Sequence, residues 1–268
     1  MSHEEEKAEN RPVESDARKK GGAANALPAW SGGRLVLGMA LIALSLGLLS
    51  GLGHRWQWWS FRTGFLVLKW AAYGAIVILL LSAIGMYRAR PGRGRPGFGR
   101  NLLAFLLSGV LAGIPALGLY RAKQVPRIHD ISTDTGNPPL FVTLLPLRLE
   151  TPNGAAYGGL DVAIQQQKAY PEIDTLLMTD APAATFDKAL STAKTLRWEI
   201  VAADAEALRI EATDTTFWFG FKDDIVIRIR PMDTGSRLDI RSMSRVGLSD
   251  VGANAARIRR YIDLIRKK

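Results

Sequence analysis

The run LVLGMALIALSLGLLSGLG, residues 35–53, decides the class of this protein. It holds no charged residue and lies between Arg34 and the pair His54-Arg55. An apolar helix of about 20 residues crosses the ~30 Å hydrocarbon core of a bilayer. A cleaved signal peptide is the rival interpretation, but its basic residues would lie near the extreme N-terminus, and no small-residue cleavage site is evident. We therefore expect a retained membrane helix.

Two further apolar runs follow. One lies between Arg62 and Arg88 and carries a single charge, Lys69, whose long side chain can reach the membrane interface. The other spans residues 102–120 and contains Pro115, which a membrane helix tolerates when neighbouring groups satisfy the freed carbonyl. The sequence thus predicts three transmembrane helices.

The chain divides into three parts. Residues 1–33 are polar without apolar periodicity and are expected to be a disordered tail; residues 34–121 form the transmembrane region, and residues 122–268 a soluble domain. Of the formal net charge of +10, residues 1–120 contribute 14 Lys/Arg against 6 Asp/Glu, and the remainder 21 against 19. Because the excess surrounds the apolar runs, we expect no nucleic-acid partner. The absence of cysteine excludes disulfides and thiolate sites.

The basic residues also predict an orientation. Segment 88–100 holds five arginines and no acidic residue, whereas segment 54–62 holds two arginines. Because cytoplasmic loops are enriched in Lys and Arg, the tail and the arginine-rich segment are expected in the cytoplasm. Three crossings then place the C-terminal domain outside it, in a multi-pass protein of the plasma (inner) membrane. No acidic residue lies within an apolar run, so we do not expect an ion pathway.

The soluble half is predicted to form a helix, a four-stranded antiparallel meander and a helix, which gives an α+β domain. Helical spacing predicts the first helix over residues 183–196, after a short one over 160–169. Alternating apolar residues predict strands over 198–204, 207–219, 225–230 and 237–245. Ser249 and Asp250 are expected to begin the last helix, whose apolar face holds Val251, Ala255, Ile258, Ile262 and Ile265.

A symmetric turn at Asp223-Asp224 would place Phe219, Arg228 and Asp239 in one row across the sheet, beside Phe217 and Phe221. Such a phenylalanine row facing solvent would be an unusual exposed patch. Two interpretations remain open. Either the proline-rich segment 121–182 covers this face, or the face forms a groove for a ligand, a lipid or a protein partner.

The segment VPRIHDISTDT, residues 125–135, holds the strongest candidates for chemistry. His129, Asp130 and Asp134 are residue types that serve as metal ligands or as an acid–base pair. The alternative is that the aspartates and hydroxyls form turn hydrogen bonds. His129 is the only histidine of the soluble half, so we expect no metal site and no cofactor, and whether the protein is an enzyme stays uncertain.

A second candidate surrounds the beginning of the last helix. Arg241, Arg245, Asp250 and Asn254 lie near a helix N-terminus, where free N–H groups favour anions. A phosphate or carboxylate could bind there. The alternative is a self-contained cap, in which Asp250 or Ser249 accepts hydrogen bonds from the first turn.

Several blocks of the soluble half, in order, resemble the uncharacterised family called domain of unknown function 1499. They are IHDISTDTGNPPLF (128–141), WEIVAAD (198–204), IEATDTTFWFGFKDDIVIRIRP (210–231) and DIRSMSRVGLSDVGANAARIRRYI (239–262). The resemblance covers residues 125–265 and supports the domain boundary. It implies no activity, cofactor or catalytic residue.

Two functional hypotheses follow. In the first, the extracytoplasmic domain binds a ligand, a lipid or a protein partner of the cell envelope. In the second, the protein is a membrane-anchored hydrolase that uses His129 with Asp130 or Asp134. A purely structural role in a membrane complex is a third alternative.

Overall fold

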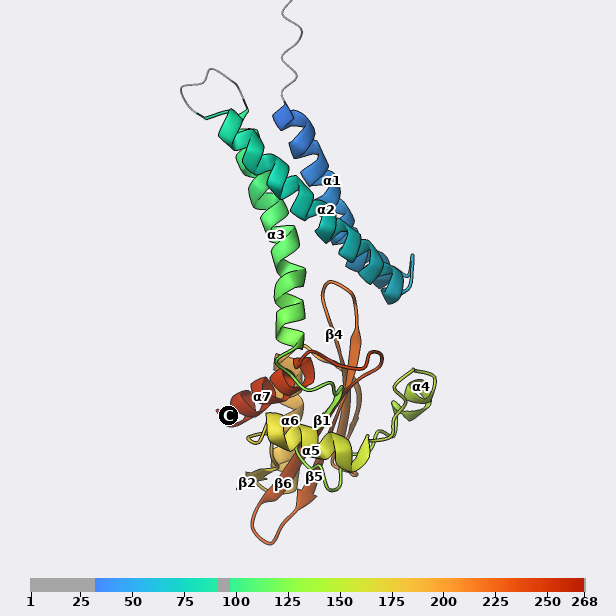
Figure 1. Cartoon of the computed structure of the whole chain (residues 1–268). Coiled ribbons are helices and arrows are strands. Elements are labelled where there is room, and N and C mark those ends of the chain that lie inside the picture. The colour runs from blue at the N-terminus through green and yellow to red at the C-terminus, as the bar shows by residue number, and fades with distance from the viewer. Residues whose placement is uncertain (1–31, 91–96, 268) are drawn as a thin grey trace, which may run out of the picture.

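The computed structural model describes residues 32–90 and 97–267. The predicted disordered tail therefore lies outside the described residues, except for Gly32 and Gly33, which begin the first helix. Within these ranges the chain forms three long apolar helices followed by a domain built on an antiparallel sheet (Figure 1).

The three apolar helices are α1 (Gly32–Arg55), α2 (Phe61–Arg88) and α3 (Phe98–Ala122). Each is long and apolar enough to cross a membrane, which is what the three apolar runs predict. They pack through small residues, because Ala40 and Gly47 of α1 and Ala75 of α2 are buried. Small side chains let helix backbones approach closely. We call α1, α2 and α3 the apolar bundle.

The sheet has six strands rather than the four predicted. They are β1 (Asp130–Ser132), β2 (Leu176–Met178), β3 (Glu199–Asp204), β4 (Arg209–Thr215), β5 (Lys222–Pro231) and β6 (Ser236–Ser244). The order is β1-β6-β5-β4-β3, and β2 also pairs with β6. The two additional strands have three residues each, too few for an alternating pattern to be recognised. Both lie along the outer edge of β6.

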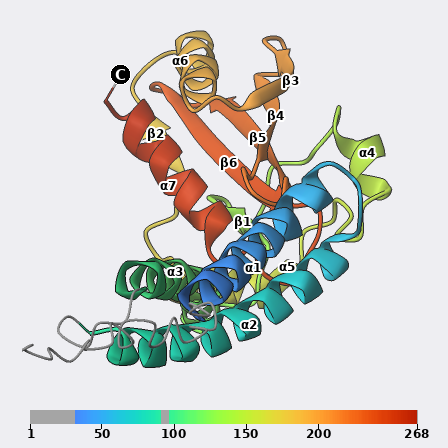
Figure 2. The same cartoon turned by 90° about the horizontal axis from the view of Figure 1, so that it is seen from above.

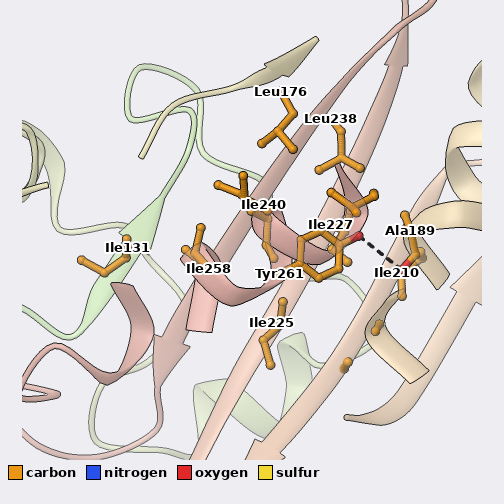
Figure 3. Close-up of a cluster of buried hydrophobic side chains, with 14 of the residues drawn as sticks. Ile131, Leu176, Ala189, Ile210, Ile225, Ile227, Leu238, Ile240, Ile258 and Tyr261 are labelled. Carbon is orange, nitrogen blue, oxygen red and sulfur yellow. Dashed lines mark hydrogen bonds between the residues drawn. The ribbon is translucent and has the colours of Figure 1, made fainter. Parts of the chain in front are cut away.

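Four helices complete the domain: α4 (Leu145–Leu149), α5 (Gly159–Ala169), α6 (Pro182–Thr195) and α7 (Ala253–Ile265). Seen from above, α7 and α4 lie on opposite sides of the sheet (Figure 2). The core lies between the sheet and α6 and α7, where isoleucines of β4, β5 and β6 meet Ile258 (Figure 3). Burying each such side chain stabilises the fold by about 1.5–3 kcal/mol. The buried Tyr261 hydroxyl donates to the Ala189 carbonyl at 3.2 Å.

The predicted register is right for one hairpin and wrong for the other. Between β5 and β6, Ile229 faces Leu238 and Arg228 faces Asp239, as expected. Between β4 and β5, however, Arg228 faces Arg209 and not Phe219. The turn comprises residues 216–221 instead of Asp223-Asp224, which lie within β5.

Local chemistry explains the earlier turn. The Thr216 hydroxyl accepts a hydrogen bond from the Phe221 N–H at 2.8 Å, and Gly220 has a φ of +67°, which glycine adopts at little cost. Asp223 and Asp224 have the appearance of turn residues, but both are buried in the sheet beside arginines. Their charges are neutralised by residues distant in the sequence.

The tip of the β4–β5 hairpin contacts the apolar bundle (Figure 1). The Trp218 indole lies against α1, where a Cβ added to Gly51 would be 2.4 Å from its ring. The Arg55 guanidinium donates to the carbonyl of Phe217 at 2.7 Å, and the Phe219 ring lies 4.8 Å from that of Phe65 in α2. The phenylalanines predicted to form a row on one face of the sheet therefore belong to this tip, and Phe219 is buried.

The proline-rich segment does cover the second face of the sheet. Phe141 and Leu144 pack on Val226 and Met243. The buried Glu211 carboxylate accepts hydrogen bonds from three consecutive backbone N–H groups, those of residues 142–144, at 2.7–3.0 Å. The segment thus closes this face at Val226 and Met243, whereas the phenylalanines that it was expected to cover lie at the hairpin tip against the apolar bundle.

Candidate functional site

A pocket of about 180 Å³ lies between the start of α2 and the domain, next to the loop that joins β6 to α7. Its walls come from the apolar bundle, the β4–β5 hairpin and the β6–α7 loop. The lining residues are Phe61, Phe65, Thr216, Phe221, Asp223, Ser244, Val246, Gly247, Ser249, Asp250, Val251 and Ala253. We call it the interface pocket.

Aromatic rings form one wall of the interface pocket. Phe61 and Phe65 are one helical turn apart at the start of α2, so they lie on the same side of the helix. Ser60 caps this helix by accepting the Thr63 N–H at 3.3 Å, which fixes where its first turn begins. Phe221 follows the hairpin tip, and its ring centroid lies 6.1 Å from those of both Phe61 and Phe65. The wall therefore joins the bundle to the domain.

Asp250 contributes the polar wall. Its carboxylate accepts the N–H groups of Gly252 at 2.8 Å and of Asn254 at 2.7 Å, and so caps α7. Burial raises the pKa of this carboxyl, the two backbone hydrogen bonds lower it, and the nearby Asp223 raises it, with a net result above the ordinary 3.8. Among the residues that the structure describes, no lysine or arginine lines the pocket.

The second carboxylate of the pocket differs from the first. Asp223 is paired with Arg257 of α7 at 2.6 Å, and Arg257 also binds Asp214 at 2.8 Å. Asp250 has no such cation among the described residues, and it accepts hydrogen bonds from the backbone N–H groups of Gly252 and Asn254. An incoming cation or hydroxyl donor would thus find one uncompensated carboxylate beside three aromatic rings.

The structure does not bring His129, Asp130 and Asp134 together. Asp130 forms a two-point ion pair with the buried Arg241 at 2.9 and 2.7 Å, while Asp134 contacts arginines of β5 and β6. In the part of the chain that is described, the His129 ring makes no hydrogen bond; its backbone carbonyl accepts from Ser244 instead. Neighbouring residues at a strand point to opposite faces, which separates His129 from Asp130. The described residues also contain no group of three or more metal-ligating side chains.

The anion site expected at the start of α7 is not assembled either. Arg241 is fully buried against Asp130, and Arg245 binds Asp224 at 2.8 Å. Asp250 occupies the helix N-terminus, as the capping alternative expects. Asn254 joins β6 to this helix, because its amide donates to the Ser244 hydroxyl at 3.0 Å.

A family model described as a protein of unknown function, DUF1499, matches residues 130–265. The chain belongs to this family. The match spans the strands and helices from β1 to α7, so the polar wall of the interface pocket lies within the DUF1499 domain. Phe61 and Phe65 lie outside the matched residues. A search of curated proteins found no match.

Within the DUF1499 domain, Arg228 and Asp239 face each other as predicted and form part of an ion-pair cluster on the covered face of the sheet. Phe219 lies behind the pocket wall, with its ring stacked on Phe221 at 5.3 Å. Of the candidate residues, Asp250 alone lines the interface pocket.

Sequence reasoning missed Phe61, Phe65, Phe221 and Asp223 as pocket residues. The spacing of Phe61 and Phe65, one turn apart at a helix start, is a signal that the sequence does contain. These phenylalanines line the same pocket as the β6–α7 loop of the DUF1499 domain, which lies nearly two hundred residues later in the sequence. No local sequence pattern predicts this tertiary arrangement.

Proposed function

We propose that this protein is a multi-pass plasma-membrane protein whose DUF1499 domain lies outside the cytoplasm and binds the polar head of a membrane amphiphile in the interface pocket. The observation that carries the proposal is the composition of that pocket. Phenylalanines of an apolar helix form one side, and the uncompensated Asp250 carboxylate forms the other.

The orientation is supported by where the basic residues lie. Arg34 and the arginine-rich segment 88–100, with five arginines, adjoin the ends of α1, α2 and α3 that are remote from the DUF1499 domain (Figure 1). The opposite ends carry only Arg55, Arg62 and Arg121 among the arginines of these three helices. Enrichment of arginine at one end of a bundle is typical of the cytoplasmic side. The opposite end carries Trp56 and Trp58, both exposed, as in the aromatic belts at membrane interfaces. The pocket lies at this end, at the level where lipid head groups would be found.

The chemistry of the pocket favours a cationic head. An ammonium group would pair with Asp250 and lie near the faces of Phe61, Phe65 and Phe221, which attract cations. An anionic head would meet two carboxylates and no basic side chain. A volume of about 180 Å³ is well above the roughly 10–15 Å³ that a single buried water needs. That is room for a small head group, with its chains left in the bilayer.

Native mass spectrometry of the full chain in detergent tests this proposal. We expect added phosphatidylethanolamine to be retained better than phosphatidylglycerol, and Asp250→Asn to lose that preference. Asparagine keeps one acceptor oxygen for the N–H groups of residues 252 and 254 and is favoured near helix N-termini, so this variant should fold. Asp233→Asn, at an exposed position in the β5–β6 turn, is the matched control and should behave as the original protein does.

The proposal fails if the two lipids are retained equally, or if Asp250→Asn keeps the preference. A second variant, Phe65→Ser, opens the aromatic wall without touching the carboxylate. It should weaken retention of phosphatidylethanolamine while α7 stays capped, and unchanged retention would contradict the role of the wall.

A further inference from the structure

Three arginines on the covered face of the sheet surround two carboxylates. Arg228 and Arg230 belong to β5 and Arg237 belongs to β6, where it faces Arg230 across the strands. All three donate to one oxygen of Asp134, at 3.1, 3.0 and 2.7 Å. The same three donate to Asp239 at 3.1, 2.9 and 3.1 Å. We call Arg228, Arg230 and Arg237 the arginine triad.

The aspartates form the inner layer of this cluster and the arginines the outer one. The side chain of Asp239 is fully buried and that of Asp134 is 12% exposed, whereas the three arginines are 20%, 35% and 34% exposed. Hydrogen bonds from Thr175 and the arginines outweigh the effect of burial, and the pKa of Asp239 lies below its ordinary value. Asp239 is therefore an ionised anchor that holds the guanidinium groups in place.

Each guanidinium of the arginine triad keeps donors that the cluster does not use. Arg228 and Arg230 donate through Nη2, and Arg237 through Nε and Nη2. Among the residues that the structure describes, no hydrogen bond reaches the Nη1 of any of them. The Nε atoms of Arg228 and Arg230 also have no partner, but they are buried, so the Nη1 groups are the donors that a ligand can reach. Guanidinium groups held close together with spare donors are suited to an oxyanion.

The charge balance of the cluster also favours an anionic ligand. Three cations face two anions in direct contact, which leaves an excess of one positive charge. Asp174 is exposed, its side chain accepts the N–H of Thr175, and, against the effect of burial, its charge helps to raise the pKa of Arg237 without direct contact. Exposed charges without contact contribute little because water and salt screen them.

The position of the triad separates its ligand from the bilayer. Arg230 lies eight residues along β5 from Lys222, where the strand leaves the hairpin tip that contacts the apolar bundle. At about 3.3 Å per residue this amounts to roughly 26 Å. The β5–β6 hairpin lies at the end of the domain opposite the bundle (Figure 1). Lipid head groups at the interface pocket are therefore out of reach of the triad.

We infer that the arginine triad is a binding site for a phosphate group carried by a water-soluble or polymeric ligand. A phosphate offers more acceptor oxygens than a carboxylate, and so can engage donors from all three guanidinium groups. This site is distinct from the interface pocket, and its ligand does not depend on the one bound there.

Titration of the full chain in detergent with inorganic phosphate, followed by isothermal calorimetry at constant ionic strength, tests the inference. We expect saturable binding that Arg230→Gln weakens about tenfold, since a hydrogen bond to a charged group contributes roughly that factor. Arg266→Gln, an exposed arginine after α7, removes the same charge elsewhere and should leave binding unchanged. Asp250→Asn should also bind phosphate normally.

Three outcomes would overturn the inference. One is phosphate binding no stronger than that of chloride at the same ionic strength. Another is an equal loss in Arg230→Gln and Arg266→Gln, which would indicate a general charge effect. The third is acetate binding as tightly as phosphate, because the site would then not select for the additional oxygens.

Discussion

The indole N–H of Trp218 donates to the backbone carbonyl of Leu48 at 3.0 Å, and so joins the DUF1499 domain to α1. The two residues are separated by 170 positions in the sequence. The ring lies on Gly51, where a side chain would collide with it. This contact fixes the hairpin tip, and with it Phe221, one of the three rings of the interface pocket.

Gly51→Ala should therefore loosen the domain from the apolar bundle. A Cβ at this position would lie 2.4 Å from the indole, so the hairpin must shift. Gly38→Ala is the matched control, because nothing lies within 4 Å of its added Cβ. We expect a lower melting temperature and faster proteolysis of residues 216–221 in Gly51→Ala alone. Equal behaviour of the two variants would contradict the contact.

The buried ion pairs predict a sharp contrast in stability. Arg148 and Asp224 are both fully buried and lie 2.7 Å apart. Asp224→Ala leaves an uncompensated buried cation and should lower the free energy of unfolding by about 3–5 kcal/mol. Glu172→Ala breaks the exposed pair with Arg259 and should cost at most about 1 kcal/mol. Thermal unfolding of both variants in detergent would show the difference, and similar losses would contradict the buried network.

The pKa of Asp250 predicts a pH dependence. Because it is raised above 3.8, the folded state holds this proton more tightly than the unfolded state. The resulting stabilisation is present below pH 3.8 and is lost as the pH rises through the raised pKa. The difference in melting temperature between the original protein and Asp250→Asn should change over this range. A constant difference would contradict the raised pKa.

Ligand binding should depend on pH in the opposite direction to stability. An ammonium head pairs with the ionised carboxylate, so retention of phosphatidylethanolamine should increase as the pH rises through the pKa of Asp250. Native mass spectrometry over a pH series measures this. Retention that is independent of pH, or that falls as the pH rises, would indicate that Asp250 does not bind the head group.

Parts of this architecture follow directly from sequence patterns. Long apolar runs, with Lys69 as their single charge, predict α1, α2 and α3, and alternating isoleucines predict the β5–β6 register, where Ile227 faces Ile240. These signals are strong because burial of one face imposes them residue by residue. The order of α6, the meander β3–β6 and α7 follows in the same way.

Other parts depend on contacts between distant residues. In the sequence, Asp223 and Asp224 resemble turn residues. In the structure they pair with Arg257 and Arg148, and no local pattern predicts these partners. β1 and β2 exist because β6 offers an unpaired edge. The interface pocket requires that the start of α2 meets the β6–α7 loop. The sequence therefore indicates Asp250 as a candidate but none of the pocket phenylalanines.

The proposed function depends on the DUF1499 domain lying outside the cytoplasm, which cysteine labelling can establish. The chain has no cysteine, so a single one can be introduced at the exposed Thr234 or, separately, at Gly94 in the arginine-rich segment. A membrane-impermeant maleimide is then added to intact cells. We predict labelling of Thr234→Cys, and labelling of Gly94→Cys only after permeabilisation. The reverse pattern would place the DUF1499 domain in the cytoplasm and contradict the account.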